Sequence, residues 1–265
     1  MTERHDDGAT EIHPTASVDP KAELASGVRV GPYAVIGGAA RVGRGTQIGP
    51  HVIIEGSVEI GERCQLYAGV VVGTPPQDLK YREGTHSGVR IGNENRIREY
   101  VTIHRALVED GWTTIGDGNF IMAGSHIAHD CRLGNGIVIV NYTGLTGFVE
   151  VEDRVVISGL TGILPYCRVG TMAYVGGWTK VVQDVPPYFV VEGNPAEARA
   201  VNVVGLRRND VPPEIRLDLQ RAFKLLYRSG LNRTQAIERI KSEITVSEPV
   251  THLVEFIQAS KRGVC

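Results

Sequence analysis

Residues 28–49 have the sequence VRVGPYAVIGGAARVGRGTQIG, and this stretch decides the fold. An aliphatic residue stands at every sixth position, and a glycine follows each one. This spacing matches neither the period of about 3.6 residues in a helix nor the period of about two in a strand. It is typical of hexapeptide repeats, in which short strands and turns wind into a parallel β-helix. Three hexads make one triangular coil, so residues 18 apart in the sequence are expected to stack about 4.8 Å apart.

The same spacing covers most of the chain as far as Val181, but it is interrupted twice. The first break adds 13 residues after Val72. At the second break, the hexad after Ile103 has a glutamate, Glu109, at the position of the aliphatic residue. Solenoids place insertions on the surface, often at the binding face. We therefore predict loop insertions near residues 73–85 and 105–113, although the second could instead be a defect tolerated within the coil.

The glycines and the composition agree with a tightly wound coil. The chain has 32 glycines among 265 residues, and only 6% of its residues are aromatic. We expect each repeat aliphatic to point into a narrow core, and the glycine after it to turn the corner at low steric cost. The net charge of −2 argues against a general nucleic-acid binder.

Cysteine usage and apolar patterning indicate a cytoplasmic protein. The four cysteines form no C-x-x-C pair, so we expect free buried thiols rather than disulfides. The polar N-terminal segment lacks the apolar core of a signal peptide. No stretch approaches the ~20 apolar residues of a membrane span. The cysteines are Cys64, Cys131, Cys167 and Cys265.

The part of the chain beyond the repeat is predicted to be helical. Pro186 and Pro187 end the repeat, and three helical patterns follow. Their expected starts are Pro212 with Pro213, Asn232 and Ser247. We therefore predict a β-helix domain over residues 1–186 and a helical domain over residues 187–265.

Residues 201–242 carry nine Lys and Arg against four Asp and Glu, an excess of five positive charges in a chain that is acidic elsewhere. This basic segment is either an ordinary solvated helical surface or a docking face for an acidic partner or phosphate groups.

The repeat register also predicts a reactive site. His129 lies two residues after the inward Ile127 and is followed by Asp130, a combination suited to general-base work near neutral pH. Gly147 is 18 residues further along, so it should sit one coil above His129. A glycine there lets a substrate carbonyl approach a backbone N–H, as in an oxyanion hole. A base beside such a donor suits acyl transfer to a hydroxyl, with no metal or cofactor.

A zinc site is an alternative, because His104, His126 and His129 are three candidate ligands. The register does not fix whether the break after Ile103 brings His104 alongside the other two.

Several motifs resemble the UDP-N-acetylglucosamine acyltransferases that start lipid A synthesis. They are residues 77–81 (QDLKY), 97–99 (IRE), 101–105 (VTIHR), 126–131 (HIAHDC), 183–188 (QDVPPY), 193–194 (GN) and 222–230 (AFKLLYRSG). The resemblance spans nearly the whole chain. It implies a left-handed parallel β-helix, an exception to the usual right-handed crossover. It also implies a C-terminal helical domain and a homotrimer with sites in the clefts between subunits.

In that family a 3-hydroxyacyl chain moves from acyl carrier protein to the 3-hydroxyl of the UDP-sugar. The resemblance implies that His129 is the general base, that Asp130 supports it and that the Gly147 N–H holds the oxyanion. Gly177 stands where the family gauges acyl length, and a glycine there favours a longer chain. The implied substrate contacts are Asp78, Lys80 and His126, with Gln77 for the sugar nucleotide, and Asn202 and Arg208 for the diphosphate or donor arm.

The chain departs from the family pattern where members often carry polar side chains. These positions are Phe148, Leu164, Pro165, Pro195 and Val204. These departures are compatible with a family enzyme that has different sugar contacts, with a paralogue that acylates an amino UDP-sugar, and with a weakly active relative. Three alternatives from other classes also stay open: an acetyl-CoA-dependent acetyltransferase, a zinc hydratase of the solenoid type and a non-catalytic binder of carrier protein.

Overall fold

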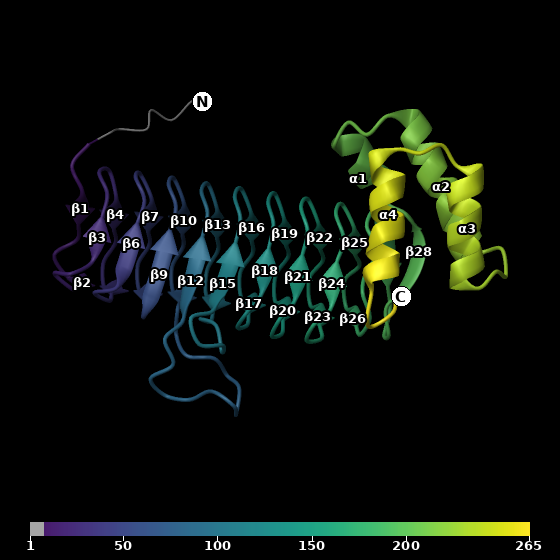
Figure 1. Cartoon of the computed structure of the whole chain (residues 1–265). Helices are drawn as coiled ribbons and strands as arrows, with labels where there is room; N and C mark the ends of the chain where they lie inside the picture. The colour runs from purple at the N-terminus through teal and green to yellow at the C-terminus, as the bar shows by residue number, and fades with distance from the viewer. Residues whose placement is uncertain (1–7) are drawn as a thin grey trace.

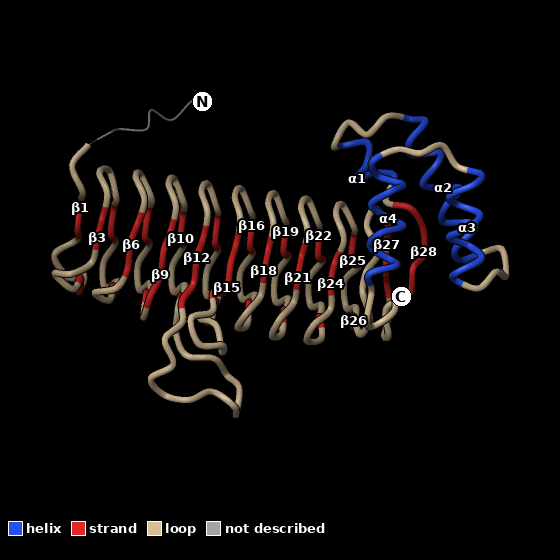
Figure 2. The backbone as a smooth tube through the Cα atoms, in the orientation of Figure 1, coloured by secondary structure: helices blue, strands red, loops and turns tan. Residues whose placement is uncertain are grey.

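The computed structural model describes residues 8–265. The first seven residues, which belong to the N-terminal segment searched for a signal peptide, lie outside the described part. Short parallel strands wind into the predicted left-handed β-helix, and three sheets form its sides (Figures 1 and 2). We call them sheets A, B and C in the order in which the chain visits them.

Each sheet takes every third strand of the coil. Sheet A contains β1 Glu11–Ile12, β4 Arg29–Val30, β7 Gln47–Ile48, β10 Gln65–Leu66, β13 Arg96–Ile97, β16 Phe120–Ile121, β19 Val138–Ile139, β22 Val156–Ile157, β25 Tyr174–Val175, β27 Phe189–Glu192 and β28 Glu197–Val201. Sheet B contains β2 Ser17–Val18, β5 Val35–Ile36, β8 Ile53–Ile54, β11 Val71–Val72, β14 Thr102–Ile103, β17 His126–Ile127, β20 Gly144–Leu145, β23 Gly162–Ile163 and β26 Lys180–Val181. Sheet C contains β3 Glu23–Leu24, β6 Ala40–Val42, β9 Ser57–Ile60, β12 Gly88–Ile91, β15 Trp112–Ile115, β18 Arg132–Leu133, β21 Glu150–Val151 and β24 Arg168–Val169.

The strand register confirms the six-residue repeat and both insertions. In the regular coils, residues 18 apart are partners, as Val30 is with Ile48. Ile91 pairs with Ile60 across the first insertion and with Ile115 across the second. The second break is therefore an excursion from the coil and not a defect within it. Both insertions leave the coil at the corner between sheets B and C, and Figure 1 shows them projecting together.

The predicted role of the glycines that follow the aliphatic residues is wrong for the regular coils. There the positive φ that turns the corner lies two residues after the glycine, as at Tyr33 and Gly45. Gly73, where the first insertion begins, does have the predicted positive φ, at 84°. The glycine of a regular coil is instead required by close packing between coils. A Cβ on Gly43 would lie 2.5 Å from the carbonyl carbon of Gly61, so the backbones of successive coils could not approach.

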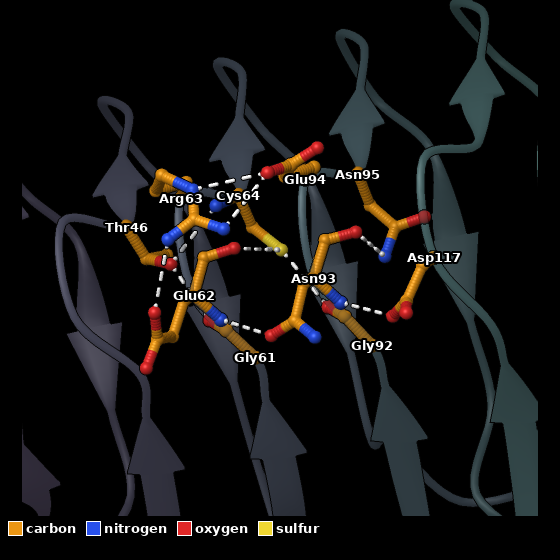
Figure 3. Close-up of polar contacts among 10 residues, drawn as sticks. All are labelled: Thr46, Gly61, Glu62, Arg63, Cys64, Gly92, Asn93, Glu94, Asn95 and Asp117. Atoms are coloured by element: carbon orange, nitrogen blue, oxygen red, sulfur yellow. Dashed lines mark hydrogen bonds and ion pairs between the residues drawn. The ribbon is translucent and has the colours of Figure 1, made fainter.

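Polar side chains line the corner between sheets C and A (Figure 3). The buried hydroxyl of Thr46 accepts a hydrogen bond of 3.0 Å from the Cys64 N–H one coil further on. The Asn95 side chain likewise donates to the Gly116 carbonyl at 2.8 Å. These bonds satisfy backbone groups that the turn leaves without a strand partner.

The four cysteines are free, as predicted. Cys64, Cys131 and Cys167 are buried, and Cys265 is half-buried. Burial raises the pKa of the Cys131 thiol to about 12, so that this thiol is not a nucleophile at neutral pH.

The chain beyond Pro187 is not purely helical, contrary to the prediction. Strand β27 continues sheet A in parallel, and β28 returns antiparallel to it. The helices follow, and the first was not predicted. They are α1 Val203–Arg208, α2 Pro213–Tyr227, α3 Arg233–Glu243 and α4 Glu248–Ala259. Asn232 caps α3 as predicted, by accepting a hydrogen bond from the Gln235 N–H.

The helices have their own hydrophobic core, separate from the column of aliphatic residues inside the coil. It contains residues of α2, α3 and α4 together with Phe189 of β27. The domain boundary after residue 186 stays a prediction. None of the helices within residues 8–265 is long and apolar enough to cross a membrane.

Candidate active site

His129 lies at the corner between sheets B and C, two residues after the end of β17, and is only 7% exposed. Its Nδ1 lies 2.8 Å from Oδ2 of Asp130. A carboxylate can only accept, so Nδ1 donates in this contact. The contact therefore selects the neutral tautomer in which Nε2 carries the lone pair and can take a proton.

Asp130 is held from two further directions. Its Oδ2 also accepts a hydrogen bond of 2.8 Å from the backbone N–H of Leu107, which lies in the second insertion. Its own backbone N–H donates to the Thr113 hydroxyl at 2.8 Å. Asp130 adopts a left-handed conformation with φ of 58°, which few residues other than glycine tolerate at low cost.

Gly147 lies directly against the imidazole, which confirms the predicted stacking. A Cβ at this position would be 2.4 Å from Cε1 of His129 and 2.6 Å from Nε2. Among residues 8–265 no acceptor faces the Gly147 N–H. A free backbone donor thus lies beside the base, where a thioester carbonyl would need it.

The first insertion brings Asp78 to the dyad. Its Oδ2 lies 3.6 Å from Nε2 of His129, and its Oδ1 accepts a hydrogen bond of 2.7 Å from the Lys80 backbone N–H. The first insertion is joined to the start of the second by Arg105, whose guanidinium donates to the Tyr81 hydroxyl at 2.6 Å. The side chains of Gln77 and Lys80 are exposed at the same loop.

His126 and His104 form a histidine pair. Their ring centroids are 4.7 Å apart, and Nδ1 of His126 lies 2.7 Å from the Thr102 hydroxyl. Burial, with a smaller effect of His129, lowers the pKa of His126. Burial, together with His126 and His129, lowers the pKa of His104 to about 4. Within residues 8–265 these side chains and their neighbours form no group of three metal ligands.

An aromatic pair covers the other side of the dyad. The Phe148 ring meets the His129 ring edge-on at 5.3 Å between centroids, and it stacks on Tyr166 at 4.7 Å. Both rings line a groove of about 510 Å³ that crosses sheet C, together with Asp130 and Arg132. The sequence predicted the departure at Phe148 but not the stacking partner, although Tyr166 lies 18 residues further on in the register.

Three predicted site residues do not meet His129 within one chain. The Asn202 side chain caps α1 by accepting from the Gly205 N–H at 3.0 Å, and it donates to the Met172 carbonyl at 2.8 Å. Arg208 is the last residue of α1. Gly177 follows β25 at the corner between sheets A and B, whereas His129 follows β17 at the corner between sheets B and C.

Family models match both parts of the chain. The model described as UDP N-acetylglucosamine O-acyltransferase, domain 2, matches residues 184–265. The model described as bacterial transferase hexapeptide (six repeats) matches residues 39–74 and 113–147.

Full-length relatives and solved structures agree with these models. Relatives named acyl-[acyl-carrier-protein]–UDP-N-acetylglucosamine O-acyltransferase are 48% identical in Thermodesulfovibrio yellowstonii and 50% identical in Alkalilimnicola ehrlichii, over 96% of this chain and 99% of each relative. The acyltransferase structure from Acinetobacter baumannii has a TM-score of 0.91 at 39% identity, over 96% of this chain and 98% of that one. The one from Bacteroides fragilis has a TM-score of 0.93 at 33% identity, over 96% of this chain and 99% of that one. The chain therefore belongs to the UDP-N-acetylglucosamine O-acyltransferase family.

Proposed function

We propose that the protein transfers a 3-hydroxyacyl chain from acyl carrier protein to the 3-hydroxyl of UDP-N-acetylglucosamine, the first step of lipid A synthesis. The carrying observation is the contact of His129 with Asp130 through Nδ1 and with the Gly147 backbone on its Nε2 side. The names of the full-length relatives support the same donor and acceptor.

In the proposed reaction, Nε2 of His129 removes the proton from the sugar hydroxyl as its oxygen attacks the thioester carbon. The Gly147 N–H stabilises the oxyanion of the tetrahedral intermediate. Collapse of this intermediate breaks the carbon–sulfur bond, and the proton on Nε2 passes to the leaving thiolate. Asp130 stabilises the imidazolium between the two proton transfers. The products are the 3-O-acyl sugar nucleotide and the free carrier-protein thiol.

Acceptor contacts are proposed for the first insertion and the second histidine. Asp78 approaches Nε2 closely enough to orient a hydroxyl that bonds to both. Lys80 and His126 would contact the substrate, and Gln77 the sugar nucleotide. His126 suits such a role because its Nδ1 is engaged by the Thr102 hydroxyl, which leaves its other ring nitrogen to pair with a polar group.

A homotrimer is supported by the separation of the proposed groups. Gly177, for which we propose the acyl-length role, lies on a different corner from His129, so a second chain has to supply it. Asn202 and Arg208, proposed for the diphosphate or donor arm, also do not meet the dyad in one chain. Exposed apolar side chains mark the corner between sheets A and B as a contact surface. They are Tyr33, Tyr100, Tyr142, Leu160 and Trp178.

The basic segment supports carrier protein as the donor. Eight of its nine cations are exposed, and of these Arg221 and Arg239 form ion pairs with neighbouring carboxylates. The remaining exposed cations would attract an acidic carrier protein. We propose the cytoplasm as the compartment, since free buried cysteines are typical of reducing surroundings.

The aromatic pair favours one alternative acceptor. Phe148 and Tyr166 put apolar rings beside the base, where a hydroxyl-rich sugar would gain from polar contacts. A paralogue that acylates an amino UDP-sugar on nitrogen is therefore the second candidate. The alternatives of zinc chemistry, acetyl-CoA and carrier binding without turnover have no such support.

A panel of donors and acceptors tests the proposal. Acyl-carrier-protein thioesters of several chain lengths and acetyl-CoA are each combined with UDP-N-acetylglucosamine and with its 3-amino analogue, and the products are identified by mass spectrometry. We expect an ester on the 3-oxygen of UDP-N-acetylglucosamine from a 3-hydroxyacyl carrier-protein donor. Amide product alone, or turnover only with acetyl-CoA, would assign the chain to one of the alternatives.

A further inference from the structure

The backbone of Asp130 is held in a way that differs from its neighbours along the same corner. The N–H groups of Phe148 and Tyr166 donate to backbone carbonyls one coil earlier, those of His129 and Gly147. The coil before Asp130 is interrupted by the second insertion, so a backbone carbonyl is not the acceptor for the Asp130 N–H. The Thr113 hydroxyl accepts this hydrogen bond instead, at 2.8 Å.

Thr113 is itself an exception at its position. It is the second residue of β15, fully buried and facing inward. The partner positions in the two preceding strands of sheet C carry Val58 and Val89, which are also fully buried. A hydroxyl has therefore replaced a methyl group inside an apolar column, where a polar group costs free energy unless it is bonded. Its bond to the Asp130 N–H offsets that cost.

The same insertion supplies the second contact. The Leu107 N–H donates at 2.8 Å to Oδ2 of Asp130, the same oxygen that accepts the hydrogen bond from Nδ1 of His129. Two donors on one oxygen fix the carboxylate plane, and the Thr113 bond fixes the backbone from which it extends. All three contacts converge on Asp130, which turns the corner with a φ of 58°.

We infer that Thr113 is a positioning residue, which together with the Leu107 N–H clamps Asp130 so that His129 keeps its Nδ1 proton and Nε2 stays a free base. The inference rests on the proposed function of the His129–Asp130 dyad. It assigns a purpose to the second insertion, whose Leu107 N–H bonds to Asp130.

The test replaces Thr113 with valine, the residue of the two neighbouring coils. Thr113→Val keeps the shape and removes the acceptor, and we expect kcat to fall on the order of tenfold with KM for both substrates unchanged. Thr113→Ser keeps the hydroxyl and should retain most of the wild-type kcat. Thr46→Val is the matched control, because Thr46 is equally buried and its hydroxyl also accepts a backbone N–H (Figure 3). Thr46 lies between β6 and β7, at a different corner of the coil from the dyad.

A double-mutant cycle separates positioning from a general loss of stability. If Thr113 acts through Asp130, Thr113→Val should lower kcat in the wild type and change little in an Asp130→Asn background. The inference would be overturned if Thr113→Val lowered kcat by the same factor in the Asp130→Asn background as in the wild type. It would also be overturned if Thr113→Val and Thr46→Val had equal rates.

A measurement without substrate distinguishes this inference from the proposed function. Imidazole ¹⁵N NMR of His129 reports which ring nitrogen carries the proton in the unliganded protein. We expect the Nδ1-protonated form in wild type, Thr113→Ser and Thr46→Val, and a mixture of tautomers in Thr113→Val. An unchanged tautomer in Thr113→Val contradicts the clamp even if the reaction is as proposed. Inactive wild type with the expected tautomers would contradict only the reaction.

Discussion

Gly147 lies so close to the His129 ring that its missing side chain is part of the site. A methyl group there would approach Nε2 to 2.6 Å, well inside normal contact distance, and the ring would have to move. The same glycine offers the free N–H proposed to hold the oxyanion. One residue thus determines both the position of the base and the donor opposite the thioester.

Gly147→Ala should therefore lower kcat by about 10²-fold or more, because the base and the oxyanion donor are displaced together. Steady-state kinetics with the carrier-protein thioester would measure this effect. Gly162→Ala is the control, since a Cβ there meets no atom within 4 Å. Equal rates for both variants would mean that the close contact has no catalytic consequence.

The sequence register predicted the stacking of Gly147 on His129 because both residues belong to regular coils. The register did not predict the role of Thr113. The insertion between His104 and Trp112 interrupts the coil before Asp130, so the residue that the register would have placed opposite the Asp130 N–H is displaced. The signal was nevertheless present, as a threonine at a position held by valine in two neighbouring coils. Side-chain hydrogen bonds of this kind do not follow from the periodicity.

At the scale of elements, the two insertions leave from the corner that carries the dyad. The first supplies Asp78, and the second supplies the Leu107 N–H. Their positions in the chain were predicted from the broken repeat. Their internal contacts were not, because a loop outside the coil has no partner 18 residues away. The bond between Arg105 and Tyr81 is one of these contacts.

Tyr81→Phe removes the hydroxyl that Arg105 holds and should loosen the loop carrying Asp78. We expect KM for the UDP-sugar to rise by roughly three- to tenfold with a smaller change in kcat, since ordering the loop then opposes acceptor binding. Tyr67→Phe, which removes a hydroxyl bonded to Gln65 on sheet A, should leave KM unchanged. If kcat fell by a larger factor than KM rose, Tyr81 would instead act in the chemical step.

The elements after the repeat were predicted only in part. The longer helices α2, α3 and α4 have amphipathic patterns that the sequence makes visible. Strand β27 has no six-residue spacing, and α1 has only six residues, too few to display a helical period. The helical core that β27 joins is what makes this segment a strand, and that packing is not encoded locally.

At the scale of the molecule, a half-buried polar cluster joins the coil to α4. Nε2 of His252 lies 3.1 Å from Glu152, and its Nδ1 lies 3.0 Å from the Tyr188 hydroxyl. The hydrogen bond to Glu152 outweighs burial and raises the pKa of His252. Burial raises the pKa of Glu152, but the hydrogen bonds that its carboxylate accepts from His252 and Thr171 outweigh burial and leave the pKa lowered.

These shifts predict how stability depends on pH. The raised pKa of His252 stabilises the folded state below its ordinary value of 6.5, and this contribution is lost as pH rises through the folded pKa. The lowered pKa of Glu152 stabilises the folded state at pH values above 4.5, the ordinary pKa of this group, and this contribution is lost as pH falls through the folded pKa. Both contributions are present between these two values. His252→Gln should therefore cost about 1 kcal/mol of unfolding free energy near pH 5.5 and less above pH 8.

Urea denaturation of wild type and His252→Gln across this pH range measures the difference. Arg239→Gln, which breaks an exposed pair within α3, is the control and should show little pH dependence between pH 5.5 and pH 8. A difference that grows with pH would contradict the assigned shifts. The proposed trimer is checked in the same samples by sedimentation, which should give roughly three times the chain mass of 28.7 kDa.

The central claim is that His129 is the general base of an acyl transfer. The direct measurement is the turnover of His129→Ala with a 3-hydroxyacyl carrier-protein thioester and UDP-N-acetylglucosamine, compared with wild type under the same conditions. We expect a loss on the order of 10²-fold or more, with the sugar nucleotide still bound. A variant that turns over at the wild-type rate would contradict it.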